Sequence, residues 1–160
     1  MDRLLTRARL VSLAAAGSAG LLAGAFMFQL LGYAPCQMCI WQRYPHAIAV
    51  VVGLIWLWLG ARWLLLMGAA AAATTSAIGF YHAGVEQSWW QGPTTCSAGP
   101  IDTLSPDALL DQIMTAPLVR CDDIPWELFG ISMAGWNGVI SLILALLWLR
   151  ALVARSVSGS

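Results

Sequence analysis

Four cysteines are the residues of this chain whose types and spacing could do chemistry. Cys36 and Cys39 form a Cys-Gln-Met-Cys turn directly after a long apolar run. Cys96 and Cys121 lie in the only long polar stretch, with 24 residues between them. Two nearby thiols can close a disulfide and reopen it, and a second pair can exchange with the first by thiolate attack. The cysteines therefore indicate a device that moves electrons between disulfides, provided that both pairs reach the same place.

The elements that must position these cysteines are membrane helices. The chain has 59% apolar residues, 10% charged residues and a mean hydropathy of +0.73, which is far from the balance of a soluble domain. A bilayer core of roughly 30 Å takes about 20 helical residues, and lipid satisfies no backbone polar group. We therefore predict an all-α membrane protein, a bundle of four transmembrane helices forming one integral membrane domain over residues 1–160. The spans are expected at about 10–31, 44–61, 63–83 and 128–149.

The first span has a rival interpretation. Arg3, Arg7 and Arg9 precede it, as in the positively charged start of a secretory signal peptide. Its 22 uncharged residues exceed the usual hydrophobic region of a cleaved signal. We therefore interpret the run as a retained span.

Arginine positions predict the orientation of the bundle. Six of the eight arginines flank one set of span ends, and only Arg43 and Arg120 flank the other. Excess arginine marks the cytoplasmic side, so both termini are predicted to be cytoplasmic. Outer loops then lie at about 32–43 and 84–127, and each carries one cysteine pair. Both pairs are thus expected on the same extracytoplasmic side, where disulfides persist.

The long outer loop is predicted to carry a short amphipathic helix. Ser105 and Pro106 suit the cap and the first position of a helix, and Pro117 sets its limit. Between them the apolar residues fall on one face at helical spacing: Leu109, Leu110, Ile113 and Met114. Such a helix could lie on the outer leaflet or pack on the bundle, and the pattern fits both arrangements.

The beginning of the second span favours a reactive thiolate. Helix amides that point at Cys36 and Cys39 stabilise negative charge on sulfur. If the helix already runs from Cys39, Arg43 lies one turn further on the same face and adds a permanent positive charge. Pro45 removes one backbone donor, so the exact start of this helix stays open.

The cysteines also allow less active interpretations. The Cys-x-x-Cys pair could be a structural disulfide or half of a metal site, and the outer pair could be a static staple. The two histidines, His46 and His82, do not follow a zinc spacing, so no metal is expected. All eight basic residues are arginine and the net charge is zero, so no basic patch invites nucleic acid.

The motifs together resemble the DsbB family of disulfide bond formation proteins. The resemblance covers nearly the whole chain and rests on Cys36-Gln-Met-Cys39-Ile-Trp-Gln-Arg43-Tyr-Pro, on His82 shortly before Cys96, and on Cys121-Asp-Asp-Ile-Pro-Trp126-Glu-Leu-Phe-Gly130-Ile-Ser-Met133. It implies an enzyme of the bacterial inner membrane with its cysteine loops in the periplasm. Such an enzyme reoxidises a DsbA-like oxidase of thioredoxin fold and passes two electrons to the membrane quinone pool.

The resemblance also implies roles for single residues. Cys96 and Cys121 would form the mobile disulfide that meets the reduced partner, with Cys96 taking the mixed disulfide. The reduced loop pair would then exchange with Cys36 and Cys39, and Cys39 would face the quinone.

Three further residues match quinone-site positions of the family: Arg43, which supports quinone binding, His82 near the quinone ring, and Met133 near the same pocket. His46 has no assigned role. The sequence does not specify ubiquinone or menaquinone, or which DsbA-type partner the protein serves. A quinone also fits by elimination, because the chain has no dinucleotide fingerprint, no convincing haem site and only four cysteines available for any cluster.

Three alternatives were considered. In a vitamin K epoxide reductase-like enzyme the loop cysteines precede the Cys-x-x-Cys, whereas here they follow it. A reductase conducting electrons outward from the cytoplasm needs cysteines within its spans, and the predicted spans contain none. A non-enzymatic scaffold with two disulfide staples would show inert sulfurs under mild reductant, which alkylation would reveal.

Overall fold

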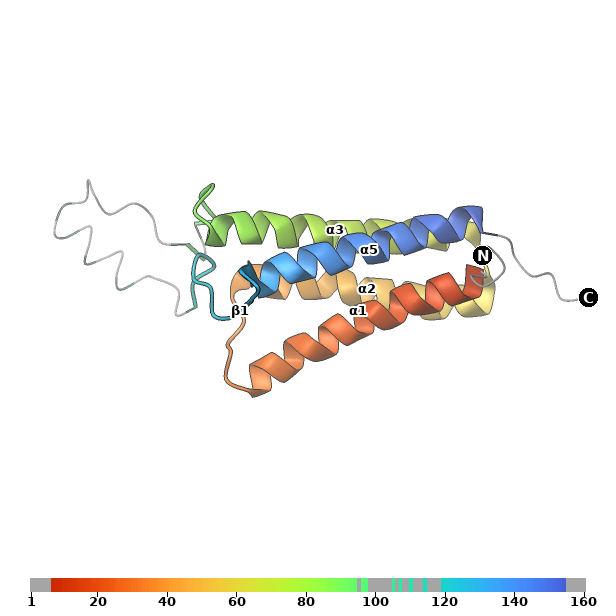
Figure 1. Ribbon diagram of the computed structural model, residues 1–160, viewed down its shortest axis with the longest axis horizontal. Helices are drawn as coiled ribbons and strands as arrows, with labels where there is room; N and C mark the ends of the chain where they lie inside the picture. Colours follow the sequence, from red (N-terminus) through yellow and green to blue (C-terminus); the bar gives the residue numbers. More distant parts are fainter. Residues whose placement is uncertain are drawn as a thin grey trace, which may run out of the picture.

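The chain is described by a computed structural model over residues 7–94, 96–97, 105, 107, 110, 114 and 119–154. Within these residues four helices are long and apolar enough to cross a membrane: α1 (Arg7–Leu30), α2 (Gln37–Leu59), α3 (Arg62–Glu86) and α5 (Met133–Val153). A small antiparallel sheet of β1 (Glu127–Leu128) and β2 (Ile131–Ser132) precedes α5. The predicted all-α membrane bundle of four helices is confirmed (Figure 1).

The helices run along one another, so the bundle has two distinct ends. The beginning of α1 and the end of α5 share one end, on the right of Figure 1, and the turns that carry the cysteines lie at the other. Helix α3 packs along both α2 and α5, whereas α1 diverges from the other helices toward the cysteine end. All buried residues of α1 lie in its first half, between Leu10 and Ser18.

The end of the bundle at the chain termini is closely packed around Trp148. A Cβ atom placed on Gly68 would lie 2.5 Å from the indole of Trp148, and one on Gly53 would lie 3.7 Å from it. Small residues thus allow the indole to fill the space between the helices. Arg7 fastens α1 there, because its guanidinium donates hydrogen bonds to the carbonyls of Ala151 and Ala154 at 2.9 and 2.8 Å.

Two helices begin at positions that differ from the sequence prediction. Helix α2 begins at Gln37, ahead of the expected position 44, and continues through Pro45. Cys36 is its N-cap, and the Cys36 Sγ accepts a hydrogen bond from the backbone N–H of Cys39.

Helix α5 begins at Met133, after the expected position 128, because the intervening residues form a hairpin. Its two turn residues, Phe129 and Gly130, have φ angles of 54° and 73°, a pattern of two positive φ values that matches the twist of paired strands. Ser132 then caps α5 by accepting a hydrogen bond from the N–H of Gly135.

The amphipathic helix predicted for residues 105–117 lies mostly outside the described residues. Of its predicted apolar face, Leu110 and Met114 are described and both are exposed. The two arrangements that the pattern allows for this face, against the lipid or against the bundle, both stay predictions.

Candidate active site

The Cys-x-x-Cys pair sits at the beginning of α2, with its two sulfurs close together. The Sγ atoms of Cys36 and Cys39 lie 3.1 Å apart, and the helix amide of Cys39 points at the Cys36 sulfur at 3.3 Å. The hydrogen bond with the Cys39 thiol, together with the nearby His82 imidazole, lowers the pKa of the Cys36 thiol well below its ordinary value. Cys36 is therefore suited to carry a thiolate.

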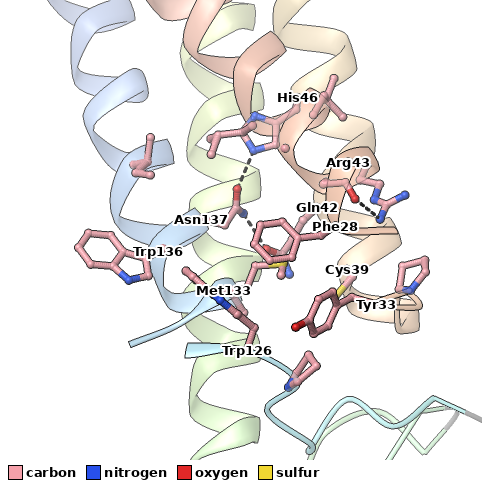
Figure 2. A pocket seen from close by; sticks show the side chains of 18 of the residues that line it. Phe28, Tyr33, Cys39, Gln42, Arg43, His46, Trp126, Met133, Trp136 and Asn137 are labelled. Atoms are coloured by element: carbon pink, nitrogen blue, oxygen red, sulfur yellow. Dashed lines mark hydrogen bonds between the residues drawn. The ribbon is translucent and has the colours of Figure 1, made fainter. Parts of the chain in front are cut away.

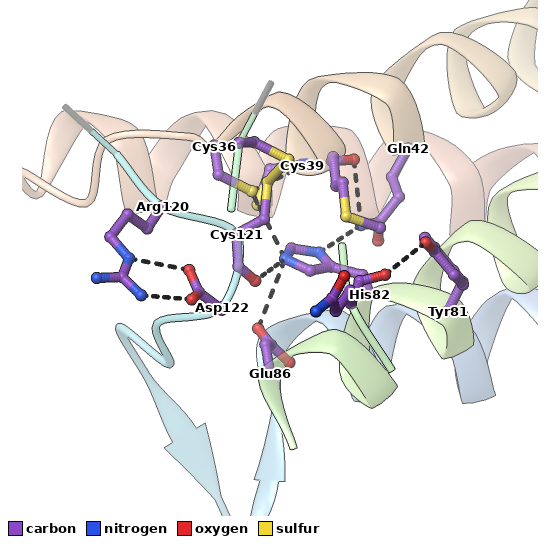
Figure 3. Close-up of a disulfide and its surroundings, with 12 residues drawn as sticks. Cys36, Cys39, Gln42, Tyr81, His82, Glu86, Arg120, Cys121 and Asp122 are labelled. Carbon is purple, nitrogen blue, oxygen red and sulfur yellow. Dashed lines mark hydrogen bonds and ion pairs between the residues drawn. A yellow bond between two sulfur atoms is a disulfide. The ribbon is translucent and has the colours of Figure 1, made fainter. Parts of the chain in front are cut away.

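The outer pair is joined, and it lies against the inner pair. Cys96 and Cys121 form a disulfide, and both residues are buried. The Cys121 N–H donates to the Cys96 carbonyl at 2.7 Å, which holds the two backbones side by side. The sulfurs of Cys36 and Cys121 and a ring nitrogen of His82 all lie within 4.8 Å of one another. All four predicted cysteines thus converge in one place (Figure 3).

His82 is the centre of this junction. Its Nε2 lies 3.1 Å from the Cys121 carbonyl oxygen and 3.6 Å from the Cys36 sulfur. Its Nδ1 lies 3.0 Å from Nε2 of Gln42. The sequence resemblance placed His82 near a quinone ring, whereas the structure places it among the sulfurs and outside the lining of the cavity described below.

Glu86 stands beside His82 at the end of α3, and sequence reasoning had not singled it out. It is buried, its Oε1 lies 3.8 Å from His82 Nε2, and the Ser132 hydroxyl donates a hydrogen bond to its other oxygen. The available signal was its position four residues after His82, which places both side chains on one helix face.

The three ligand-type atoms of Cys36, His82 and Cys121 also form a cluster that spacing along the chain could not reveal. They come from three separate segments of the chain, so the zinc-type spacing of neighbouring ligands could not reveal them. In this structure the Cys121 sulfur is bonded to the Cys96 sulfur in a disulfide.

A cavity of about 460 Å³ opens between the diverging half of α1 and the helices α2 and α5. Its size suits a small organic ligand, for which roughly 300–1,000 Å³ is typical. The wall is mainly apolar and includes Phe28, Tyr33, Pro125, Trp126, Phe129 and Trp136. Cys39, Arg43 and Met133, three of the predicted site residues, all line this cavity (Figure 2).

Arg43 joins the cavity wall to the loose end of α1. Its guanidinium donates to the Gln29 side-chain oxygen at 2.8 Å and to the Ala25 carbonyl at 3.4 Å, and it lies 5.0 Å from the centre of the Phe26 ring. Its Nε is buried and has no hydrogen-bond partner among the described residues. The positive charge of Arg43 therefore lies beside the cavity, and its Nε–H can still donate a hydrogen bond.

The polar floor of the cavity was not predicted. His46, Gln42 and Asn137 line it, and Asn137 is bonded to both of the others. Residues 39, 42, 43 and 46 follow the i, i+3, i+4, i+7 spacing of a single helix face. That spacing could have placed His46 beside Cys39 and Arg43, had the helix been extended back to Gln37.

Two cysteine pairs in contact at one end of four membrane-spanning helices define a membrane oxidoreductase of the thiol–disulfide class. Comparison with known proteins specifies the family within this class. The model of the family described as "Disulfide bond formation protein DsbB" matches residues 7–151. The chain belongs to this family, whose members are disulfide-forming oxidoreductases of the inner membrane with several membrane spans.

Curated relatives agree along nearly the whole chain. Disulfide bond formation protein B of Albidiferax ferrireducens is 32% identical, covering 94% of this chain and 91% of its own. The protein of the same name in Verminephrobacter eiseniae is also 32% identical, covering 97% and 90%. The one in a Shewanella species is 31% identical, covering 88% and 83%. No solved structure matches this chain.

Proposed function

We propose that this protein oxidises the dithiol of a DsbA-like, thioredoxin-fold partner in the periplasm and passes the two electrons to a membrane quinone. The observation that carries the proposal is the contact of the two cysteine pairs at the edge of a cavity that Cys39 lines. One route then connects a partner at the bundle surface with a ligand inside the bundle.

The contacts between the cysteines support the following sulfur steps. Cys96 is buried in this structure, so its segment must open before a partner thiolate attacks Cys96, forms a mixed disulfide and releases Cys121 as a thiolate. The second partner thiol displaces Cys96 and leaves the partner oxidised. Cys36 and Cys39 are free thiols in this structure, so the next step starts from their oxidised form. The Cys121 thiolate then attacks Cys36, its neighbour in the junction, breaks the Cys36–Cys39 disulfide and releases Cys39 toward the cavity. Attack by Cys96 on Cys121 restores the loop disulfide and leaves Cys36 and Cys39 reduced.

The quinone is the electron-accepting substrate of the last step. Oxidation of the Cys36 and Cys39 thiols to a disulfide delivers two electrons and two protons, and the quinone becomes a quinol. Over the full cycle, partner dithiol and quinone become partner disulfide and quinol, so atoms and electrons balance. Arg43 supplies positive charge where negative charge develops on an oxygen, and Met133 with the aromatic wall packs against the ring.

His82 acts at the sulfurs in this proposal. Its Nε2–H faces the Cys36 sulfur and the Cys121 carbonyl together, so it stabilises a thiolate on Cys36 and holds the Cys121 backbone close. The resemblance to the family had assigned it to the quinone ring. Its contacts favour this role in exchange between the pairs.

The orientation follows from the arginines. We propose that both termini are cytoplasmic and that the outer segments, about 32–43 and 84–127, face the periplasm. A membrane-impermeant thiol reagent should then label the reduced cysteines in intact spheroplasts. Labelling that appears only after the membrane is opened would reverse the orientation.

The decisive experiment gives the purified protein a reduced DsbA-like partner and a quinone. Equal amounts of partner disulfide and quinol should form, over many turnovers for each molecule of protein. In a Cys121→Ser variant the partner should instead be trapped on Cys96 as a mixed disulfide, with no turnover. A protein that oxidises the partner once and never reduces quinone would reject the proposal. Disulfides that resist mild reductant would support the static scaffold.

A further inference from the structure

A chain of hydrogen bonds runs through the bundle interior from the cavity to the cysteine junction. His46 Nε2 lies 2.9 Å from Asn137 Oδ1, and Asn137 Nδ2 donates to Gln42 Oε1 at 2.6 Å. Gln42 Nε2 lies 3.0 Å from His82 Nδ1 and donates to the Met38 carbonyl at 3.2 Å. Each of these contacts joins side chains of different helices or a side chain and its own helix backbone.

The backbone determines the direction of this chain. A carbonyl only accepts, so Met38 fixes the amide nitrogen of Gln42 on its side and leaves the Gln42 oxygen facing Asn137. Asn137 must then present its amide nitrogen to Gln42 and its oxygen to His46. Thr75 agrees, because its hydroxyl donates to the Gln42 carbonyl and accepts from the same Asn137 nitrogen.

The tautomer of His46 follows from that direction. Because Asn137 Oδ1 accepts, His46 Nε2 carries the hydrogen. In the neutral ring Nδ1 is therefore a bare acceptor. Nδ1 is buried and has no hydrogen-bond partner among the described residues, although His46 lines the cavity. A buried polar atom without a partner calls for an explanation such as a ligand.

The electrostatic surroundings favour the neutral ring. The other titratable side chains that line the cavity are Tyr33, Cys39 and Arg43. Arg43 lies one turn from His46 on the same helix, and two positive charges that close in a poorly hydrated cavity repel each other.

We propose that His46 recognises the reduced form of the quinone, by accepting a hydrogen bond from a quinol hydroxyl at Nδ1. A quinone carbonyl oxygen only accepts hydrogen bonds, so it has nothing to offer a bare Nδ1, whereas a quinol hydroxyl donates. Cys39 and His46 are two helical turns apart, roughly 10 Å, and Figure 2 shows His46 at one end of the drawn pocket with Cys39 further along it. One ring oxygen then faces Cys39 and the other faces His46.

The inference rests on the proposed quinone chemistry and adds a selectivity to it. A contact made only with the product stabilises bound quinol over bound quinone, and so draws electrons from the cysteines. His46 is thus a binding residue of the last step, and Asn137 and Gln42 are positioning residues that fix its tautomer.

The test is equilibrium binding of a short-chain benzoquinone and of its quinol, without oxygen, to the full-length protein. Replacement of Cys36 and Cys39 by serine prevents electron exchange during the titration, and quenching of tryptophan fluorescence reports binding. His46→Leu should weaken quinol binding about five- to tenfold, the value of one hydrogen bond of about 1 kcal/mol or slightly more. Quinone binding should change less than about twofold.

Two further variants keep the outcome clear. His46→Leu combined with Asn137→Leu also removes the Asn137 oxygen that would otherwise lose its donor, although Gln42 Oε1 then loses the donor from Asn137. It should show the same selective loss of quinol binding. Ser18→Ala, at a buried hydroxyl of α1 outside the cavity lining, should leave both affinities unchanged.

The outcomes separate the two proposals. If the serine-substituted protein binds neither form, while its fold is intact by circular dichroism, the quinone function itself fails. If it binds both forms and His46→Leu weakens them equally, or neither, the quinone function stands and the role of His46 is overturned.

Discussion

Small residues serve opposite purposes around Trp148 and along the half of α1 that lines the cavity. At the end with the chain termini, Gly53 and Gly68 let neighbouring helices and the Trp148 ring come into contact. At the cysteine end, Gly20 and Gly24 of α1 have no atom within 4 Å of where a Cβ would lie, and both line the cavity. Glycine thus allows close packing around Trp148 and leaves open space on the cavity side of α1. Helices α3 and α5 remain closely packed at the cysteine end, where a Cβ on Gly79 would lie 2.8 Å from the Gly138 backbone.

This difference teaches where stability and function reside. Between helices in lipid, packing contributes most of the association energy, because the lipid is as apolar as the side chains. The closed end supplies that packing, together with the bonds of Arg7 to the end of α5. The open end can then keep a cavity, buried polar groups and two cysteine pairs in contact. Changes at the open end should therefore affect turnover, and changes at the closed end should affect stability.

The largest expected effect is at the open end. Cys39→Ser should reduce quinone-dependent turnover roughly a thousandfold or more, as loss of a covalent catalyst does in other enzymes, because no disulfide can form with Cys36. The loop pair should still oxidise one equivalent of partner. Thermal unfolding in detergent should be nearly unchanged. A turnover rate near that of the wild type would refute the relay. It would also refute the claim that changes at the open end affect turnover.

The next effect contrasts glycines at the two ends. Gly68→Ala places a methyl group against the Trp148 ring, and such overpacking costs about 1–3 kcal/mol. The matched variant Gly20→Ala meets open space and should leave the free energy of unfolding nearly unchanged, while it raises the quinone KM slightly. Reversible unfolding in mixed micelles measures both. Equal losses of stability would show that the two ends are not distinct in the way the packing suggests.

The fold was largely predictable because membrane spans leave a strong signal. Charge-free runs of sufficient length identified all four helices, since lipid allows a lone spanning segment little else than a helix. The misplaced starts have local causes. Hydropathy could not show that Cys36 would cap α2, or that Leu128 to Ile131 would form a hairpin ahead of α5.

The site was predictable where one residue type carries the chemistry. Type and spacing predicted that the four cysteines act together, and the structure brings them to one place. Arg43 and Met133 were predicted from their place in the motifs, and both line the cavity. The interior hydrogen bonds were not, because Gln42 and Asn137 are separated by 95 positions in the chain. Their meeting depends on how α2 and α5 pack, which no local pattern specifies. The contacts of His82 with sulfur were missed for the same reason.

The third prediction separates two roles of Arg43, which are to stabilise negative charge on a quinone oxygen and to hold the end of α1 through Gln29. If its charge stabilises the reduced oxygen, Arg43→Ala should raise the quinone KM about tenfold, a loss of about 1.4 kcal/mol. Arg43→Lys keeps the charge but loses the planar fork, so its effect should be smaller. Steady-state kinetics against quinone concentration measure both.

The control for Arg43 lies on α1. Gln29→Met removes the partner of the Arg43 guanidinium and leaves the charge in place. It should have a quinone KM close to that of the wild type. If Gln29→Met and Arg43→Ala raise KM equally, Arg43 acts by holding the loose end of α1 instead.

The smallest expected effect concerns the thiolate at the junction. The hydrogen bond with Cys39 and the nearby His82 imidazole lower the pKa of the Cys36 thiol. A thiol with a lowered pKa is ionised at neutral pH, and its thiolate is lost only when the pH falls through that lowered pKa. His82→Leu removes one of the lowering contacts, so the thiolate should already be lost at a higher pH, by about one unit. Ultraviolet absorbance of the thiolate, in reduced protein whose loop cysteines are replaced by serine, follows this titration.

Glu86→Gln removes a charge at the same place and should not raise the pKa of Cys36, in contrast to His82→Leu. Glu86 lies 3.8 Å from His82, and a negative charge there opposes a second negative charge on the Cys36 sulfur. Removing that charge should leave the pKa of Cys36 unchanged or lower it further, whereas His82→Leu should raise it. If both variants raise the pKa, they act through loosened packing of α3 against the junction. If only His82→Leu does, the imidazole stabilises the thiolate directly, and the open end uses its buried histidine for chemistry.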